Sequence, residues 1–175
     1  MRRKIIAGVT GAVLAIAAIG PANAAEREQV RAVINLISTI KMPYPEGHGR
    51  NLAHTEYVRL GPIGEIVACL RADDKVRWCF EHIPPLGSRV EALRIRNEPA
   101  DGISAGQTYT YIADYDLDGQ VDLGSTTRLD PPPHAPAALV SQFYHRGANR
   151  GDGFRSDYQR LFDEGVQIAL QHLGE

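Results

Sequence analysis

The sequence predicts a single α+β domain, in which an antiparallel β-sheet of about four to six short strands is flanked by an N-terminal helix and C-terminal helices. Two observations support this prediction. Apolar residues recur at helical spacing near both ends of the chain, in 26–40 and 156–169. Between these ends lie short segments rich in β-branched and aromatic residues, separated by turn-forming Gly, Pro and Asp. Short strands joined by such turns favour an antiparallel sheet.

The N-terminal helix is predicted over Glu26 to Ile40, because its apolar residues share one side and Pro43 ends the pattern. The strands are expected at 55–60, 65–72, 76–81, 89–96 and 108–113. A further short helix is expected from Pro136 to Arg146. The last helix is expected to start at Ser156, because Ser156 and Gln159 have the spacing of a capping box.

The first 24 residues have the pattern of a secretory signal peptide. Met1 to Lys4 gives a positive start, an apolar run of 15 residues follows from Ile5 to Ile19, and Ala22 to Ala24 is a small-x-small cleavage site. The run is shorter than the ~20 residues that span a bilayer. We therefore expect cleavage after Ala24 and a mature domain over Ala25 to Glu175. We expect the product to be periplasmic or secreted and not held in a membrane.

Cleavage would also make the chain more acidic. It removes three of the 19 basic residues, which leaves 16 against 21 acidic residues and a net charge of −5. An acidic domain has no broad electrostatic attraction for nucleic acid or for anionic lipid. We therefore expect neither as a partner, and a protein or a small molecule remains open.

The two cysteines, Cys69 and Cys79, are predicted to form a disulfide. An even number of cysteines in an exported chain favours pairing. The segments 65–72 and 76–81 read as two strands of a hairpin around Asp73 to Lys75. In that hairpin the two cysteines lie directly across from each other, within reach of an S–S bond.

The acidic loop, which we define as Asp114 to Asp122, places four carboxylates in nine residues without a Lys or Arg among them. In an extended segment Asp114, Asp116 and Asp118 project from one face, where like charges repel. A bound cation would relieve this repulsion. Asp118-Gly119 is also a strong hairpin signal, and a metal-bound turn between two strands would satisfy both readings.

The acidic loop resembles the calcium loop of EF-hand and dockerin proteins, whose pattern is D-x-[DN]-x-[DN]-G. The resemblance implies the ligands Asp114, Asp116 and Asp118 through their side chains, Gln120 through its backbone carbonyl, and Asp122 directly or through water. The twelfth position, a bidentate acid in those families, is Ser125 here. That ligand would therefore come from elsewhere, and we expect weak calcium binding, with a Kd of roughly 10⁻⁴ to 10⁻³ M.

These observations favour a non-enzymatic binding or structural domain in which calcium orders a turn. The sequence has no nucleophile elbow, no phosphate loop, no dinucleotide fingerprint and no zinc spacing among its six histidines. A small exported hydrolase is an alternative if His48 or His54 meets the acidic loop in a cleft. A protein-binding module or inhibitor is a second alternative, since Tyr109, Tyr111 and Tyr115 alternate along one strand face and can form a ligand platform.

Overall fold

The computed structural model describes residues 21–40, 55–61, 64–71, 73–87, 89–104, 106–129, 139–147 and 154–173. These residues form two helices and seven strands: α1 (Pro21–Thr39), β1 (Thr55–Leu60), β2 (Ile66–Arg71), β3 (Val76–Ile83), β4 (Ala92–Pro99), β5 (Thr108–Asp114), β6 (Leu123–Arg128), β7 (Leu139–His145) and α2 (Arg155–His172). The predicted α+β class is confirmed. Most of the predicted signal segment, His48 and His54 lie outside the described residues.

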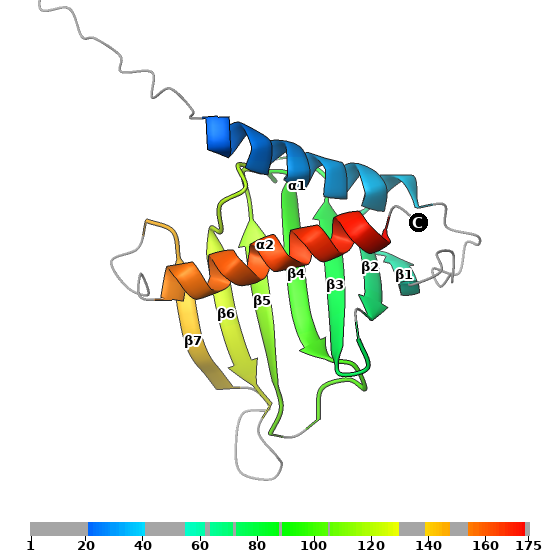
Figure 1. Cartoon of the computed structure of the whole chain (residues 1–175), viewed down its shortest axis with the longest axis vertical. Coiled ribbons are helices and arrows are strands. Elements are labelled where there is room, and N and C mark those ends of the chain that lie inside the picture. The colour runs from blue at the N-terminus through cyan, green and yellow to red at the C-terminus, as the bar shows by residue number, and fades with distance from the viewer. Residues whose placement is uncertain are drawn as a thin grey trace, which may run out of the picture.

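The seven strands of the described chain form one antiparallel sheet whose spatial order is the chain order, β1 to β7 (Figure 1). Every strand therefore pairs with its neighbours in sequence, which short turns allow. Four of the five predicted strands agree with the structure to within about two residues at each end. The strand predicted at 89–96 begins three residues later, at Ala92.

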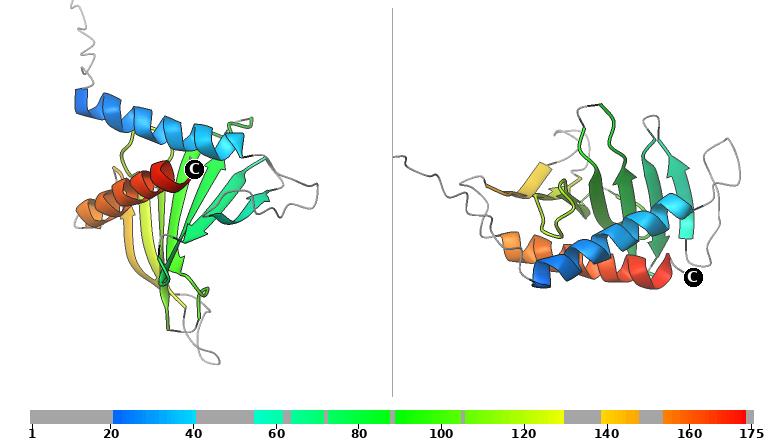
Figure 2. Two further views of the ribbon diagram at one scale, coloured as in Figure 1. Left: turned by 45° about the vertical axis from the view of Figure 1, so that its right-hand side comes forward. Right: turned by 90° about the horizontal axis from the view of Figure 1, so that it is seen from above.

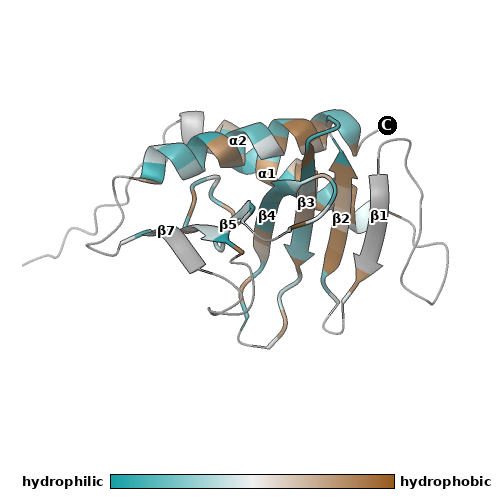
Figure 3. Cartoon of the chain, turned by 90° about the horizontal axis from the view of Figure 1, so that it is seen from below, coloured by the Kyte–Doolittle hydropathy of each residue, from teal (hydrophilic) through white to brown (hydrophobic). Residues whose placement is uncertain are grey.

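Both helices cover the same face of the sheet (Figure 2). The buried apolar side of α1 includes Val30, Val33 and Ile37, and that of α2 includes Phe162 and Val166. They pack on the inward residues of β2 to β5. In Figure 3, most of β2 has the colour of hydrophobic residues. Alternate residues of β2 to β5 point to the opposite face, which no described helix covers; we call it the open face.

The prediction for residues 136–146 was wrong, because 139–145 form the strand β7 and not a helix. Leu139, Val140 and Phe143 are spaced as on a helix, but the backbone of β6 offers an edge that needs partners. β7 pairs with that edge from Leu139 to His145. Its residue Tyr144 is buried with its ring 6.5 Å from that of Tyr158 on α2. With β6, which was not predicted, β7 raises the number of strands to seven.

The helix starts also differ from the predictions. α1 begins at Pro21, so its first turn includes the last residues of the predicted signal peptide. α2 begins at Arg155, and its N-cap residue Phe154 has no side-chain capping bond. The predicted capping box of Ser156 and Gln159 is therefore wrong. The described helices include none that is both long and apolar enough to cross a membrane.

The predicted disulfide is confirmed. Cys69 and Cys79 are partners in the register of β2 and β3, and their sulfurs are bonded. Both residues are buried on the open face, beside Val67. The bond closes a hairpin that is already local, with the two cysteines ten residues apart.

We expect the double change Cys69→Ala and Cys79→Ala to lower the free energy of unfolding by about 1 to 3 kcal/mol, because the unfolded chain gains the entropy of an open loop. Urea unfolding measures this loss. Wild-type protein unfolded with a reductant should match the double variant, and equal stability of the oxidised wild type and the variant would contradict the prediction.

Candidate functional site

The acidic loop joins β5 to β6 and is held by its own carboxylates. Asp114 is the last residue of β5 and is fully buried, and its Oδ2 accepts the N–H of Gly119 at 2.9 Å. Asp118 Oδ1 accepts the N–H of Gln120 at 2.8 Å. Gly119 has φ +87°, a conformation that suits glycine, and a Cβ there would lie 2.6 Å from the Cβ of Glu26 on α1.

The apolar residues of the loop anchor it in the core. Leu117 and Val121 are buried among the side chains of both helices and the sheet. Leu117 adopts φ +55°, which costs a residue with a side chain about 1 to 2 kcal/mol. Burial of its side chain offsets that cost at roughly 1.5 to 3 kcal/mol. The alternation of Asp with apolar residues therefore fixes which side chains turn inward and which carboxylates remain together.

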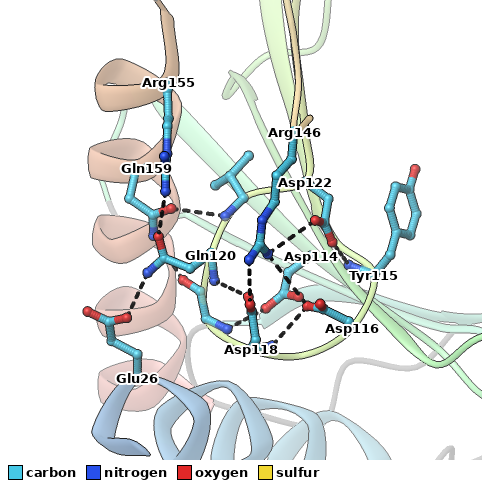
Figure 4. A network of polar contacts seen from close by, with 12 residues as sticks. Glu26, Asp114, Tyr115, Asp116, Asp118, Gln120, Asp122, Arg146, Arg155 and Gln159 are labelled. Atoms are coloured by element: carbon cyan, nitrogen blue, oxygen red, sulfur yellow. Dashed lines mark hydrogen bonds and ion pairs between the residues drawn. The ribbon is translucent and has the colours of Figure 1, made fainter. Parts of the chain in front are cut away.

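Arg146, the residue after β7, supplies positive charge to the loop (Figure 4). Its Nη2 donates to Asp118 Oδ2 at 2.9 Å, and its Nη1 lies 3.4 Å from Asp122 Oδ1. Nη1 is also 3.9 Å from Asp116 Oδ1. The hydrogen bond and the attraction of these carboxylates raise the pKa of Arg146 above its usual value. One guanidinium thus faces three carboxylates.

This single cation does not neutralise the loop. Burial raises the pKa of Asp114 to about 7, and repulsion from Asp118 and Asp116 adds to the effect. Burial and the charges of Asp118 and Asp122 also raise the pKa of Asp116. Burial opposes ionisation of Asp118 as well, but the hydrogen bonds from Arg146 and the loop backbone outweigh it and hold its pKa below the ordinary value. A negative charge is thus disfavoured at Asp114 and Asp116, and Arg146 does not offset this.

Three of the carboxylates have the spacing of a metal site. One oxygen each of Asp114, Asp116 and Asp122 lies within 4.8 Å of the others. Two oxygens on opposite sides of a calcium ion are up to ~5 Å apart, since each Ca–O distance is ~2.3 to 2.6 Å. Asp114 Oδ1 is buried and has no hydrogen-bond partner among the described residues. Such an atom is expected to be rare unless a ligand or water satisfies it.

Both helices hold the loop from the other side (Figure 4). Gln159 of α2 donates to the carbonyl of Gly119 and accepts the N–H of Val121, both at 2.9 Å. The side chain of Gln120 donates to Glu26 of α1 at 2.8 Å and accepts from Arg155 of α2 at 3.3 Å. The loop therefore contacts β5, Arg146 at the end of β7 and both helices through polar groups.

The structure brings the predicted residues Asp114, Asp116, Asp118 and Asp122 together, with Asp118 turned toward Arg146. The side chain of Gln120 is directed to the helices. Sequence reasoning missed Arg146, Gln159 and Glu26, because each is far from the loop in sequence. No local pattern marks them. The repulsion of the loop carboxylates signalled only that some cation is needed.

A second polar group lies at the other end of α1. Ser38 Oγ is 3.1 Å from His82 Nδ1, and His82 Nε2 is 2.9 Å from an oxygen of Glu91. This order of residues is that of a hydrolase triad. However, a serine nucleophile also needs N–H donors for the oxyanion, and the last turn of a helix presents carbonyl oxygens instead. We interpret the group as a polar clamp between α1 and β3.

No protein-family model, curated protein or solved structure matches the chain, so its sites are interpreted from their own geometry.

The raised pKa of Asp114 predicts a pH-dependent stability in EDTA. Because the folded state holds this proton up to about pH 7, its stabilising effect is complete below the ordinary pKa of ~3.9 and is lost as the pH rises through 7. As the pH rises from 5 to 8, we expect the free energy of unfolding of Asp114→Asn to increase by about 2 to 3 kcal/mol relative to that of wild type. Urea unfolding at each pH measures this difference. Asp74→Asn, in the exposed β2–β3 turn, is the control. Wild type and Asp114→Asn with parallel pH profiles would contradict the prediction.

Proposed function

We propose that the acidic loop binds a calcium ion and that this ion has a structural role, fixing the loop to the two helices and the end of β7. The observation that carries the proposal is the buried Oδ1 of Asp114, which has no hydrogen-bond partner among the described residues and belongs to the Asp114, Asp116 and Asp122 group. A divalent ion would satisfy this oxygen and compensate the excess negative charge.

The chemistry of the donors favours calcium. All candidate ligands are oxygens, which hard cations prefer, and their D-x-D-x-D-G spacing is that of calcium loops. We propose Asp114, Asp116 and Asp122 as the central ligands, with water at the remaining positions. The resemblance to EF-hand and dockerin loops also implies Asp118 and the carbonyl of Gln120 as ligands. In the structure, however, Asp118 Oδ2 accepts from Arg146 and its Oδ1 accepts the N–H of Gln120, so we assign Asp118 to Arg146.

Arg146 would compete with the ion. Its guanidinium lies 3.4 Å from Asp122 and 3.9 Å from Asp116, so the two cations share ligands. Calcium binding would weaken these contacts and leave Arg146 with Asp118, its shortest partner. This competition is a second reason, besides Ser125 at the twelfth loop position, to expect weak affinity.

We also propose that the chain is exported, as its N-terminal pattern suggests. The Cys69–Cys79 disulfide supports an oxidising compartment. A site of roughly 10⁻⁴ to 10⁻³ M suits extracellular calcium modules and not cytosolic sensors. Export and weak calcium binding are therefore mutually consistent.

Calorimetric titration of the 25–175 domain tests the calcium proposal. We expect saturable binding at pH 7.5 and a Tm that falls in EDTA. Asp114→Asn and Asp116→Asn should abolish the heat, since each removes a charged ligand, whereas Asp74→Asn should leave it unchanged. Wild-type protein that shows neither heat nor a shift in Tm at 10 mM calcium would refute the proposal.

The variant Arg146→Met distinguishes a calcium loop from one that Arg146 alone neutralises. In EDTA we expect the variant to be less stable than wild type, because its carboxylates lose their counter-charge. In calcium the difference should shrink, and calcium affinity should increase about tenfold because the competing cation is gone. The measurements are Tm in both conditions and calorimetric Kd. An equal loss of Tm with calcium and with EDTA would show that Arg146 is the permanent cation of the loop.

A further inference from the structure

The open face of the sheet carries a cavity of about 520 Å³ at the end of β3 and β4. Its lining residues come from β3, β4 and the segments beside them: Glu65, Glu81, Ile83, Arg89, Val90, Ala92, Arg94 and Tyr115. Cavities of ~300 to 1,000 Å³ hold small organic molecules. Apart from Tyr115 of the acidic loop, this cavity shares no lining residue with that loop or with the polar clamp of Ser38, His82 and Glu91, and neither of those groups explains it.

The charges that line the cavity are only partly compensated. On the open face, Glu98 pairs with Arg77 at 3.3 Å and with Arg96 at 2.8 Å. Within the cavity, Glu81 pairs with Arg94 at 3.3 Å. Arg89 is exposed and has no ion-pair partner among the residues that the structure describes. The Nε of Arg94 is buried, and it too has no acceptor in the described chain.

The other lining residues limit what can occupy the cavity. Ile83, Val90 and Ala92 provide an apolar surface, and two carboxylates, Glu65 and Glu81, add acceptors. A polyanion such as a nucleotide would be repelled by these carboxylates. A neutral apolar molecule that covered Arg89 would remove its charge from water without supplying a partner. A molecule with one carboxylate and several hydrogen-bond donors complements both the arginines and the glutamates that line the cavity.

We propose that this cavity binds a small organic acid whose carboxylate pairs with Arg89 and whose hydroxyl or ammonium donors face the acidic part of the wall. The shared chemistry is a carboxylate near donor groups, as found in sugar acids and in short peptides. The apolar side of the molecule packs on Val90 and Ala92, and the ring of Tyr115 forms part of the wall.

The acidic loop sets the position of that wall. The backbone N–H of Tyr115 donates to Asp122 Oδ2 at 2.7 Å, and Figure 4 shows its side chain directed away from the loop carboxylates. Tyr115 therefore belongs to the loop through its backbone and to the cavity through its ring. The proposal for the cavity does not rest on calcium binding, because the loop contacts to Tyr115 involve protein groups alone.

Ligand-observed NMR titration of the 25–175 domain, with and without calcium, tests the proposal with two matched pairs of probes. D-Glucuronate is compared with D-glucose, and glycylglycine with its C-terminal amide, so that each pair differs in the carboxylate. We expect at least one acid to bind with a Kd below 10 mM and at least tenfold more tightly than its neutral-ended partner. Arg89→Gln should remove this difference, whereas Arg160→Gln, on the exposed side of α2, should retain it.

The two pairs of probes separate the two sources of ligand. Binding of glucuronate alone indicates a sugar acid, and binding of glycylglycine alone indicates a peptide. The proposal is overturned if neither acid binds below 10 mM, if the acids bind no more tightly than their partners, or if Arg89→Gln preserves their affinity. Arg89 is exposed, so its replacement leaves the core intact.

Discussion

The burial of one carboxylate at the end of a central strand is the constraint on which the acidic end of the molecule depends. Asp114 is fully removed from water, and a buried charge is costly unless it is paired or hydrogen-bonded. The N–H of Gly119 satisfies one of its oxygens. The neighbouring carboxylates make the position still less favourable for a charge, and Arg146 compensates them only in part. The packing of α1, α2 and β7 at this end is thus linked to the charge balance of nine residues.

The two faces of the sheet carry different chemistry. The covered face is a continuous apolar core in which polar contacts occur at its margins, at the acidic loop and at Ser38, His82 and Glu91. The open face carries the disulfide and alternating Arg and Glu side chains on β3 and β4. Because successive residues of a strand point to opposite faces, each strand contributes side chains both to the apolar core and to the charged open face. A ligand at the open face can therefore be accommodated without disturbing the helices.

Local patterns predicted much of this fold. The hairpin of Cys69 and Cys79 and both terminal helices depend on residues close in sequence, and all three appear in the structure. The two-residue turn expected at Asp118-Gly119 is instead part of a longer loop between Asp114 and Leu123. The strand at 139–145 could not be predicted in the same way, because its apolar spacing suits a helix and its pairing with β6 decides the outcome. Gln159 has the spacing of a cap, yet it contacts the acidic loop 40 residues away. Partners such as Arg146 become visible only when the strands are placed side by side.

The order of the strands has a consequence for how the chain is made. A meander whose strands pair only with sequence neighbours has contacts that are mostly local, and such sheets can grow one hairpin at a time. Helix α1 is different, because it is synthesised first but reaches across to Gln120 and to Gln167 of α2. Part of its apolar side can pack on β2 and β3, which follow early in the chain, but the part that faces α2 is covered only when the end of the chain is in place. The pairing of α1 with α2 therefore joins the two ends of the described fold as its closing step.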